Sequence, residues 1–252
     1  MKQRKIAALL MALLLSLSIL AGCGTTKNNE STENVSSQGS ETIEQTSEAD
    51  ENAEAAEKLL NDLTGSYQEL WPVLFADEYA QIWLDDAAAF VGEENAEGAV
   101  EMLRSMVTAD IHREDAVSRY AEHSDETAYD CSFAEGLVTL TVNGTTISGK
   151  DSNGNDLFTH TYHYIGIEDQ RGLYEFESDK ADSGEFSYFY FAPDTPQETY
   201  HIEFRYGSDQ SKLDSYDSGS YAYWLPSGIS ADYNQKMIED CIQLFCAENL
   251  AG

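Results

Sequence analysis

The sequence predicts a mainly β domain with added helices, in which an antiparallel β-barrel is preceded by helices and followed by one more. Three observations predict this fold class. Between residues 137 and 207, short runs rich in β-branched and aromatic residues are separated by turn-forming pairs. Upstream of these runs apolar residues recur at helical spacings, and downstream the segment 234–250 carries one wide apolar stripe. Six or more strands in succession indicate an antiparallel meander that closes into a barrel.

Residues 1–22 are predicted to be a lipoprotein signal peptide. Three basic residues precede an apolar run of 15 residues, which is shorter than the roughly 20 residues that span a bilayer. The ending "LAGC" resembles the bacterial lipobox, in which the cysteine becomes the lipidated first residue, so Cys23 is the expected lipid anchor. The protein is then expected at the extracellular face of the cell envelope, anchored to the membrane. A simple secretory signal with a chance cysteine is the alternative.

Residues 23–58 are predicted to be a disordered, acidic and polar tether. The stretch has no aromatic residue and almost no large aliphatic one, so it cannot bury enough surface to offset its conformational entropy. Helix is expected to begin near Ala53, where Ala and Glu become dense. Residues 59–252 have the length and the apolar content of one domain.

Three helical segments are expected at the start of this domain, because their apolar residues recur every three or four positions. They are 77–91, 95–107 and 109–123. The strands follow, and the pair Asn143-Gly144 between two β-rich runs predicts a hairpin. The β-rich runs are 137–142, 145–148, 158–166, 172–178, 185–192 and 199–207. Helix returns at 234–250, where the apolar stripe indicates packing on the barrel.

The net charge of −32 excludes one class of partner and favours another. Nucleic acid is not expected as a partner, because its phosphates would be repelled. Cations are favoured in general, although most of these carboxylates are expected to form a solvated surface.

Besides Cys23, the chain has Cys131, Cys241 and Cys246. No Cys-x-x-Cys motif is present, so a zinc ribbon or a thioredoxin-like site is not expected. Cys241 and Cys246 lie about 7.5 Å apart along a helix axis, which is beyond disulfide reach. Three free, buried thiols are favoured, and a disulfide from Cys131 to either helix cysteine stays open.

Four motifs in order resemble the ZinT family of zinc-binding envelope proteins. They are "GSYQELWPVL" from Gly65, "RGLYEFES" from Arg171, "DSGEFSYFYF" from Asp182 and "TYHIEFRYG" from Thr199. The resemblance covers about three-quarters of the chain. It implies a lipocalin-like or calycin-like β-barrel with added helices, which agrees with the periodicity.

The resemblance also implies a zinc site of three histidines, of which this sequence keeps one. His201 matches the second member of the family's His-x-His pair, and Thr199 stands at the first. The family's Ser-Asp-His segment is shortened to "APDTP", which leaves Asp194 in its place. Glu203 leaves the same face of a strand as His201, because strand side chains repeat every two residues. His163 is the further candidate ligand.

His163 and its neighbour His160 lie three residues apart, so they face opposite sides of a strand and at most one can join a given site. Both lie beside aromatic residues. An ordinary barrel-wall histidine, bonded to a hydroxyl or a carbonyl group, is the alternative for each.

We therefore expect a lipoprotein that binds zinc or another divalent cation and contributes to metal acquisition or buffering. The resemblance implies transfer of the ion to the solute-binding protein of a metal importer. A site of one or two histidines with carboxylates is expected to be harder, and weaker for zinc, than a site of three histidines.

A lipocalin-like module that has lost the metal site and binds a small molecule or a partner is the alternative function. Aromatic residues of the strands would then line a cup in the barrel. They are Tyr162, Tyr164, Tyr188, Tyr190, Tyr200 and Tyr206. An enzyme is not expected, because no nucleophile-elbow, His-Glu-x-x-His or phosphate-loop motif occurs.

Overall fold

The computed structural model describes residues 38–121 and 128–251. Eight antiparallel strands form a closed barrel in which each strand pairs with the next along the chain and the last pairs with the first. The strands are β1 (Gly65–Glu69), β2 (Thr139–Asn143), β3 (Thr146–Lys150), β4 (Asp156–Ile167), β5 (Tyr174–Ser178), β6 (Tyr188–Phe191), β7 (Ile202–Gly207) and β8 (Ser227–Ser230). The predicted fold class is therefore confirmed.

The hairpin between β2 and β3 shows how local sequence sets the strand register. Asn143 pairs with Thr146 across the turn, and Gly144 takes a φ of 54°, which glycine adopts without steric cost. Closure of the barrel depends on two strands that the periodicity did not predict. In this closing pair, Gln68 of β1 lies opposite Ile229 of β8.

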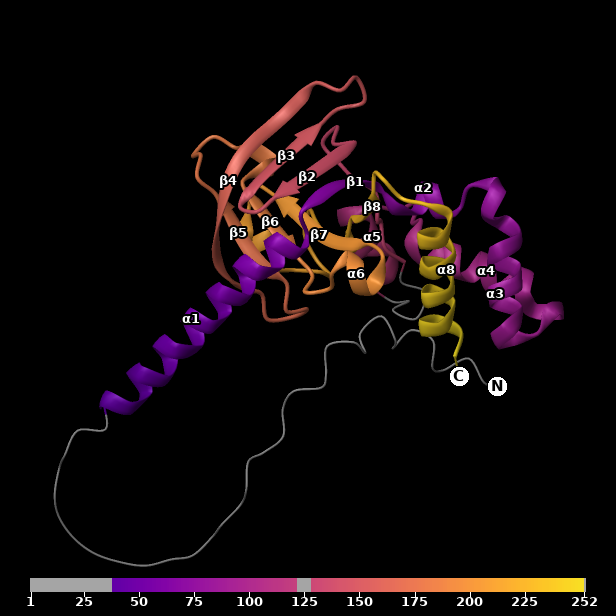
Figure 1. The fold of residues 1–252 in the computed structure, drawn as a ribbon, viewed down its shortest axis with the longest axis horizontal. Coiled ribbons are helices and arrows are strands. Elements are labelled where there is room, and N and C mark those ends of the chain that lie inside the picture. The colour runs from indigo at the N-terminus through magenta and orange to yellow at the C-terminus, as the bar shows by residue number, and fades with distance from the viewer. Residues whose placement is uncertain (1–37, 122–127, 252) are drawn as a thin grey trace, which may run out of the picture.

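Several helices gather on one side of the barrel. Figure 1 shows α2, α3, α4 and α8 on that side, while α1 runs away from the barrel on the other. The helices are α1 (Gln38–Asp62), α2 (Leu70–Leu74), α3 (Ala80–Val91), α4 (Glu93–Val107), α5 (Arg113–Tyr120), α6 (Pro196–Thr199), α7 (Gln210–Leu213) and α8 (Gln235–Leu250). Two 3₁₀ turns cover Asp77–Tyr79 and Gly184–Phe186.

Helix α1 corrects the prediction for the tether. The structure is helical over 38–62, so the helix expected to begin near Ala53 begins earlier, at Gln38. The high helix propensity of Ala and Glu, which indicated a helix near Ala53, accounts for this helix. At its C-terminal end, Leu59 and Leu60 pack into the barrel core. Residues 1–37, which include the predicted signal peptide and Cys23, lie outside the described residues.

None of the described helices combines the length and the apolar character that crossing a membrane requires.

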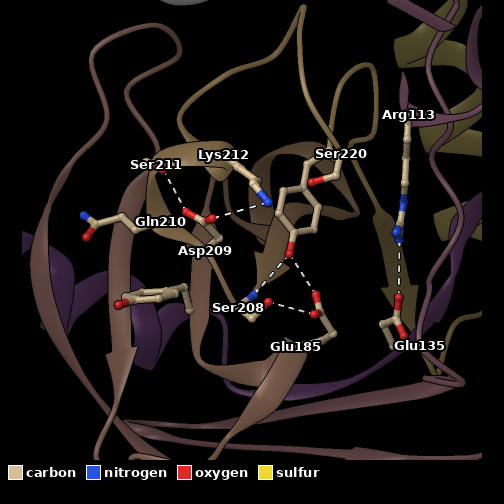
Figure 2. Close-up of a pocket in the computed structure, with 11 residues that line it drawn as sticks. Arg113, Glu135, Glu185, Ser208, Asp209, Gln210, Ser211, Lys212 and Ser220 are labelled. Carbon is tan, nitrogen blue, oxygen red and sulfur yellow. Dashed lines mark hydrogen bonds and ion pairs between the residues drawn. The ribbon is translucent and has the colours of Figure 1, made fainter. Parts of the chain in front are cut away.

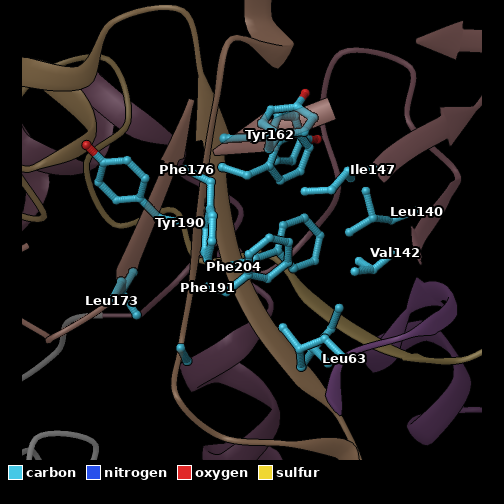
Figure 3. Close-up of a cluster of buried hydrophobic side chains, with 14 of the residues drawn as sticks. Leu63, Leu140, Val142, Ile147, Tyr162, Leu173, Phe176, Tyr190, Phe191 and Phe204 are labelled. Atoms are coloured by element: carbon cyan, nitrogen blue, oxygen red, sulfur yellow. The ribbon is translucent and has the colours of Figure 1, made fainter. Parts of the chain in front are cut away.

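The barrel interior is filled by aromatic side chains. Phe189 and Phe204 are fully buried, and the ring of Phe189 stacks on that of Tyr206 with centroids 5.3 Å apart. Figure 3 shows part of the hydrophobic core, in which Tyr162 lies with the interior rings and Tyr190 points away from them. Burying each such ring contributes about 1.5–3 kcal/mol. Three tyrosines predicted to line an open cup, at positions 162, 190 and 206, are therefore part of a packed core.

A second core lies between the barrel and the helices. Trp83 of α3 is buried, and its indole N–H donates to the carbonyl of Leu74 at 2.8 Å. Ile229 points outward from β8 and packs into this cluster together with Ile242 of α8. This packing holds α8 against the outer wall of the barrel, where it forms one side of the pocket described next.

Candidate metal-binding pocket

A small pocket of about 60 Å³ separates the start of β7 from helix α8. Its walls are mostly apolar, and its polar groups are a histidine, two carboxylates, two thiols, an arginine, a tyrosine hydroxyl and an indole N–H. The lining residues are Leu70, Trp71, Val107, Tyr129, Cys131, Arg171, His201, Glu203, Leu225, Cys241, Leu244, Phe245 and Glu248. This volume holds one or a few atoms the size of water or a metal ion.

The chain turns sharply just before His201. Helix α6 ends at Thr199, and Tyr200 takes a left-handed conformation with a φ of 66°, a common way for a helix to end. Thr199 is therefore helical and does not belong to the strand, contrary to the expected strand over 199–207. The strand begins at Ile202, so His201 immediately precedes the strand, and its side chain lies on the same side as that of Glu203.

The His201 ring is oriented by a backbone contact. Its Nδ1 lies 2.7 Å from the carbonyl oxygen of Thr199, so Nδ1 carries the proton and donates it. The other nitrogen, Nε2, then points toward Glu203, whose Oε1 is 3.8 Å away. The side chains of His201 and Glu203 are 20% and 29% exposed. Two predicted site residues are thus brought together, with the free nitrogen of one facing the carboxylate of the other.

The electrostatics of this pair favour opposite charges. Burial by itself lowers the pKa of His201, but contacts with the Cys241 thiol and the Glu203 carboxylate raise that pKa well above its usual value. Burial raises the pKa of Glu203, but the adjacent His201 and the charge of Arg171 outweigh it and lower that pKa. A positive charge between the imidazole and the carboxylate is therefore stabilised.

Two further carboxylates crowd this pair. Burial raises the pKa of Asp194, and repulsion from Glu203 raises it further. Burial also raises the pKa of Glu248, with Glu203 and Asp194 adding to it and His201 opposing it. Asp194 lies in the loop before α6 and is not among the residues that line the pocket. Three carboxylates around one imidazole make the region strongly attractive to cations.

Glu248 and Cys241 were not predicted as site residues. They lie seven positions apart on α8, with Leu244 and Phe245 between them, so all four share one helix face. The sequence signal available for Glu248 was a single acidic residue on an otherwise apolar helix face. Cys131 reaches the same pocket from the barrel side, and burial raises the pKa of its thiol. All three described cysteines are free and buried, which confirms the favoured prediction.

The structure does not bring His163 to this pocket. Phe158 and Tyr162 of β4 point into the barrel, so the alternation of the strand turns His163 to the solvent face. There it is 59% exposed and lies 3.5 Å from Glu177 on β5. The prediction of His163 as a ligand alongside His201 is therefore wrong. His160 faces the other side, among aromatic rings, and is also absent from the pocket lining.

Within residues 38–121 and 128–251, no three His, Cys, Asp or Glu side chains stand in an arrangement that could hold a metal ion. The donors present nevertheless suit zinc in kind, since zinc takes imidazole, thiolate and carboxylate ligands.

A larger polar depression of about 620 Å³ lies elsewhere, around the segment 208–212. Figure 2 shows that its charged side chains pair with neighbours in the same depression. Arg113 lies 3.6 Å from Glu135, and the hydroxyl of Ser208 donates to Glu185 at 2.7 Å. Because these charged and polar groups already interact with one another, they are less available to bind a ligand than the polar groups of the smaller pocket.

Comparison with protein-family models and with curated proteins found no match. Among solved structures, the chain is similar to the Zn(II)-bound ZinT-like domain of Streptococcus pneumoniae AdcA, with 17% identity and a TM-score of 0.46 over 75% of this chain and 89% of that one. It is also similar to Zn(II)-bound AdcA of the same organism, with 16% identity and a TM-score of 0.45 over 74% of this chain and 35% of that one. The fold class rests on the strand pairing described above.

Proposed function

We propose that this protein binds a divalent cation between His201 and Glu203, and that zinc is the ion its donors suit best. One observation carries the proposal. Because Nδ1 of His201 donates to the Thr199 carbonyl, the lone pair of the neutral ring at Nε2 points at a carboxylate. A lone pair facing an anion is unfavourable unless a proton or a metal ion lies between them.

The geometry of the pair is close to what a single ion requires. Two donors bound at about 2.1 Å to a tetrahedral zinc lie about 3.4 Å apart. His201 Nε2 and Glu203 Oε1 are 3.8 Å apart, so a shift of a few tenths of an ångström brings both to one ion. The Thr199 carbonyl supplies the outer-shell contact that fixes the orientation of a liganding histidine.

The surrounding charge supports a cation as the bound species. Asp194 and Glu248 lie near the pair, and both have their pKa raised, in part by repulsion from Glu203. A divalent cation relieves this repulsion. The net charge of −32 raises the local concentration of cations around the whole molecule.

In the cell we place this binding at the envelope, in metal acquisition or buffering. The predicted lipid anchor at Cys23 would hold the protein at the extracellular face of the membrane. The solute-binding protein of a metal importer is the partner we propose for the released ion, on the strength of the resemblance of the sequence motifs to the ZinT family.

The test is isothermal titration of the purified protein with zinc. We expect one site in the wild type and, in His201→Ala, a loss of affinity larger than the 10- to 100-fold that outer-shell changes typically cost. His163→Ala is the matched control, because it removes an exposed histidine outside the pocket. An unchanged isotherm in His201→Ala contradicts the proposal.

A further inference from the structure

One tryptophan of this chain differs from the other two in its hydrogen bonding. The indole N–H of Trp83 donates to the carbonyl of Leu74 at 2.8 Å, and that of Trp224 donates to the carbonyl of Ser132 at 2.9 Å. Trp71 is 7% exposed, and its buried Nε1 has no hydrogen-bond partner among the described residues. Because a buried donor without an acceptor is destabilising, this N–H marks a position suited to an acceptor that the protein itself does not supply.

The Trp71 indole lines the small pocket that also contains His201. Its ring is held in place, because it stacks on Phe75 with centroids 5.7 Å apart and packs against Phe245 with centroids 4.8 Å apart. The Cys131 thiol lines the same pocket, but sulfur is a weak acceptor and leaves this N–H without a partner. A ligand in the pocket is therefore the available source of an acceptor.

Arg171 brings further donors to the same pocket. It lies between β4 and β5, and its guanidinium donates to the hydroxyl of Tyr129 at 2.6 Å. The guanidinium carbon lies 5.0 Å from the ring centroid of Tyr129 and 4.4 Å from that of Tyr216, which fixes its position. In the part of the chain that the structure describes, no carboxylate forms an ion pair with it. Its remaining N–H groups are thus free to hold a ligand.

The charges that line the pocket favour one additional anion. The raised pKa of His201 and the lowered pKa of Glu203 keep these two groups oppositely charged, so their charges cancel. Burial raises the pKa of Glu248, which favours its neutral form. Arg171 is then the charge of the pocket that has no direct counter-ion, and a partly buried positive charge is stabilised by an anion beside it.

We infer that the pocket binds a small planar oxyanion, a carboxylate or bicarbonate, whose oxygens accept hydrogen bonds from the indole N–H of Trp71 and the guanidinium of Arg171. A guanidinium matches the planar, bidentate geometry of such an anion. At about 15 Å³ for each water-sized atom, the 60 Å³ of the pocket hold about four atoms, which is the size of acetate or bicarbonate. This inference goes beyond the proposed function, because the oxyanion site requires no metal ion.

The test is a ¹⁵N–¹H NMR spectrum of the three indole N–H groups, recorded in EDTA during separate titrations with sodium acetate, sodium formate and sodium bicarbonate. The Trp71 signal is identified by its absence in Trp71→Phe. We expect this signal to move downfield as the N–H gains an acceptor. The signals of Trp83 and Trp224 should stay in place, because both groups already donate to carbonyls. The separate titrations show whether a carboxylate or bicarbonate is preferred.

Arg171→Met tests the second donor. Methionine keeps an unbranched apolar side chain and removes the charge, so we expect oxyanion binding to weaken by about tenfold or more. Arg104→Met is the matched control, because the Arg104 guanidinium also lies over an aromatic ring, 4.5 Å from the centroid of Phe75, but does not line the pocket. The control should bind the anion like the wild type.

Three outcomes overturn the inference. A Trp71 signal that none of the three anions moves in the wild type does so without relying on the folding of any variant. Equal shifts of all three indole signals also overturn it, because they indicate a general effect of salt. An equal loss of binding in Arg171→Met and Arg104→Met assigns the effect to the charge of the whole molecule. Since EDTA is present throughout, these outcomes are independent of the zinc isotherm that tests His201 and Glu203.

Discussion

The replacement Glu203→Gln tests the electrostatics of the pocket in a single atom change. The amide has the shape of the carboxylate but not its charge, so it removes the partner of the protonated His201 ring. The two side chains face each other at 3.8 Å and are each less than a third exposed. In the presence of a chelator, we therefore expect the variant to be less stable than the wild type, and the deficit to depend on pH.

The size of the deficit follows from the geometry. Two unit charges 3.8 Å apart attract by about 4 kcal/mol at an effective dielectric constant near 20. Desolvation of both groups offsets much of this attraction, so the net contribution is about 1–3 kcal/mol. In a domain of this size 1 kcal/mol shifts Tm by about 2–4 °C, so a loss of about 2 kcal/mol lowers Tm by about 4–8 °C.

The pH dependence follows from the directions of the two pKa shifts. The pKa of Glu203 is lowered from 4.5 on folding, so its stabilisation is complete above that value and is lost as the pH falls through the folded pKa. The pKa of His201 is raised from 6.5, so its stabilisation is complete below that value and is lost as the pH rises through the folded pKa. The pair contributes fully between these two values.

The assay is thermal unfolding followed by circular dichroism across pH, with EDTA present throughout. We expect the difference in Tm between wild type and Glu203→Gln to be largest between about pH 5 and 6 and to shrink in alkaline buffer. Glu177→Gln is the matched control, because its pairing with His163 is exposed to solvent and is worth about 1 kcal/mol or less. A Tm difference that is constant across pH, or equal in the control, would refute the reasoning.

Two further predictions concern the barrel and the anchor. A Cβ at Gly149 would lie 2.4 Å from Cε1 of Phe158 and 2.5 Å from Cδ1 of Leu137, so Gly149→Ala should destabilise the protein by about 1–3 kcal/mol in urea unfolding. Adding Phe158→Leu should recover part of that loss, and an unchanged midpoint for Gly149→Ala alone would show that the barrel wall is looser than described. Cys23→Ser should move the protein from the membrane fraction to the soluble fraction of cells, and continued retention in the membrane fraction would rule out the lipid anchor.

The central strands could be predicted because their own residues determine them. Asn143-Gly144 marks a turn. In β4 and β7, apolar and polar residues alternate over enough positions for a strand to be recognised from the sequence. The closing strands could not be read in this way. β8 has four residues and β1 has five, and their strand conformation comes from pairing with partners far away in sequence. Local periodicity carries no information about such a pairing.

The residues of the candidate site, like the strands, could be predicted only where local spacing determines their positions. His201 and Glu203 are two residues apart, so a strand places them on one side whatever the fold. Spacing could not say which face of β4 points inward, and the burial of Phe158 and Tyr162 turned His163 away. Cys241 comes to line the pocket only through the packing of α8 on the outer wall of the barrel.

The most direct test of the account is an anomalous difference map from a crystal grown with zinc and measured at the zinc absorption edge. The account predicts one strong peak at about 2.0–2.1 Å from Nε2 of His201, with Glu203 as a further ligand. A map with no peak beside His201, in which Nε2 still faces the carboxylate without an ion, would contradict it.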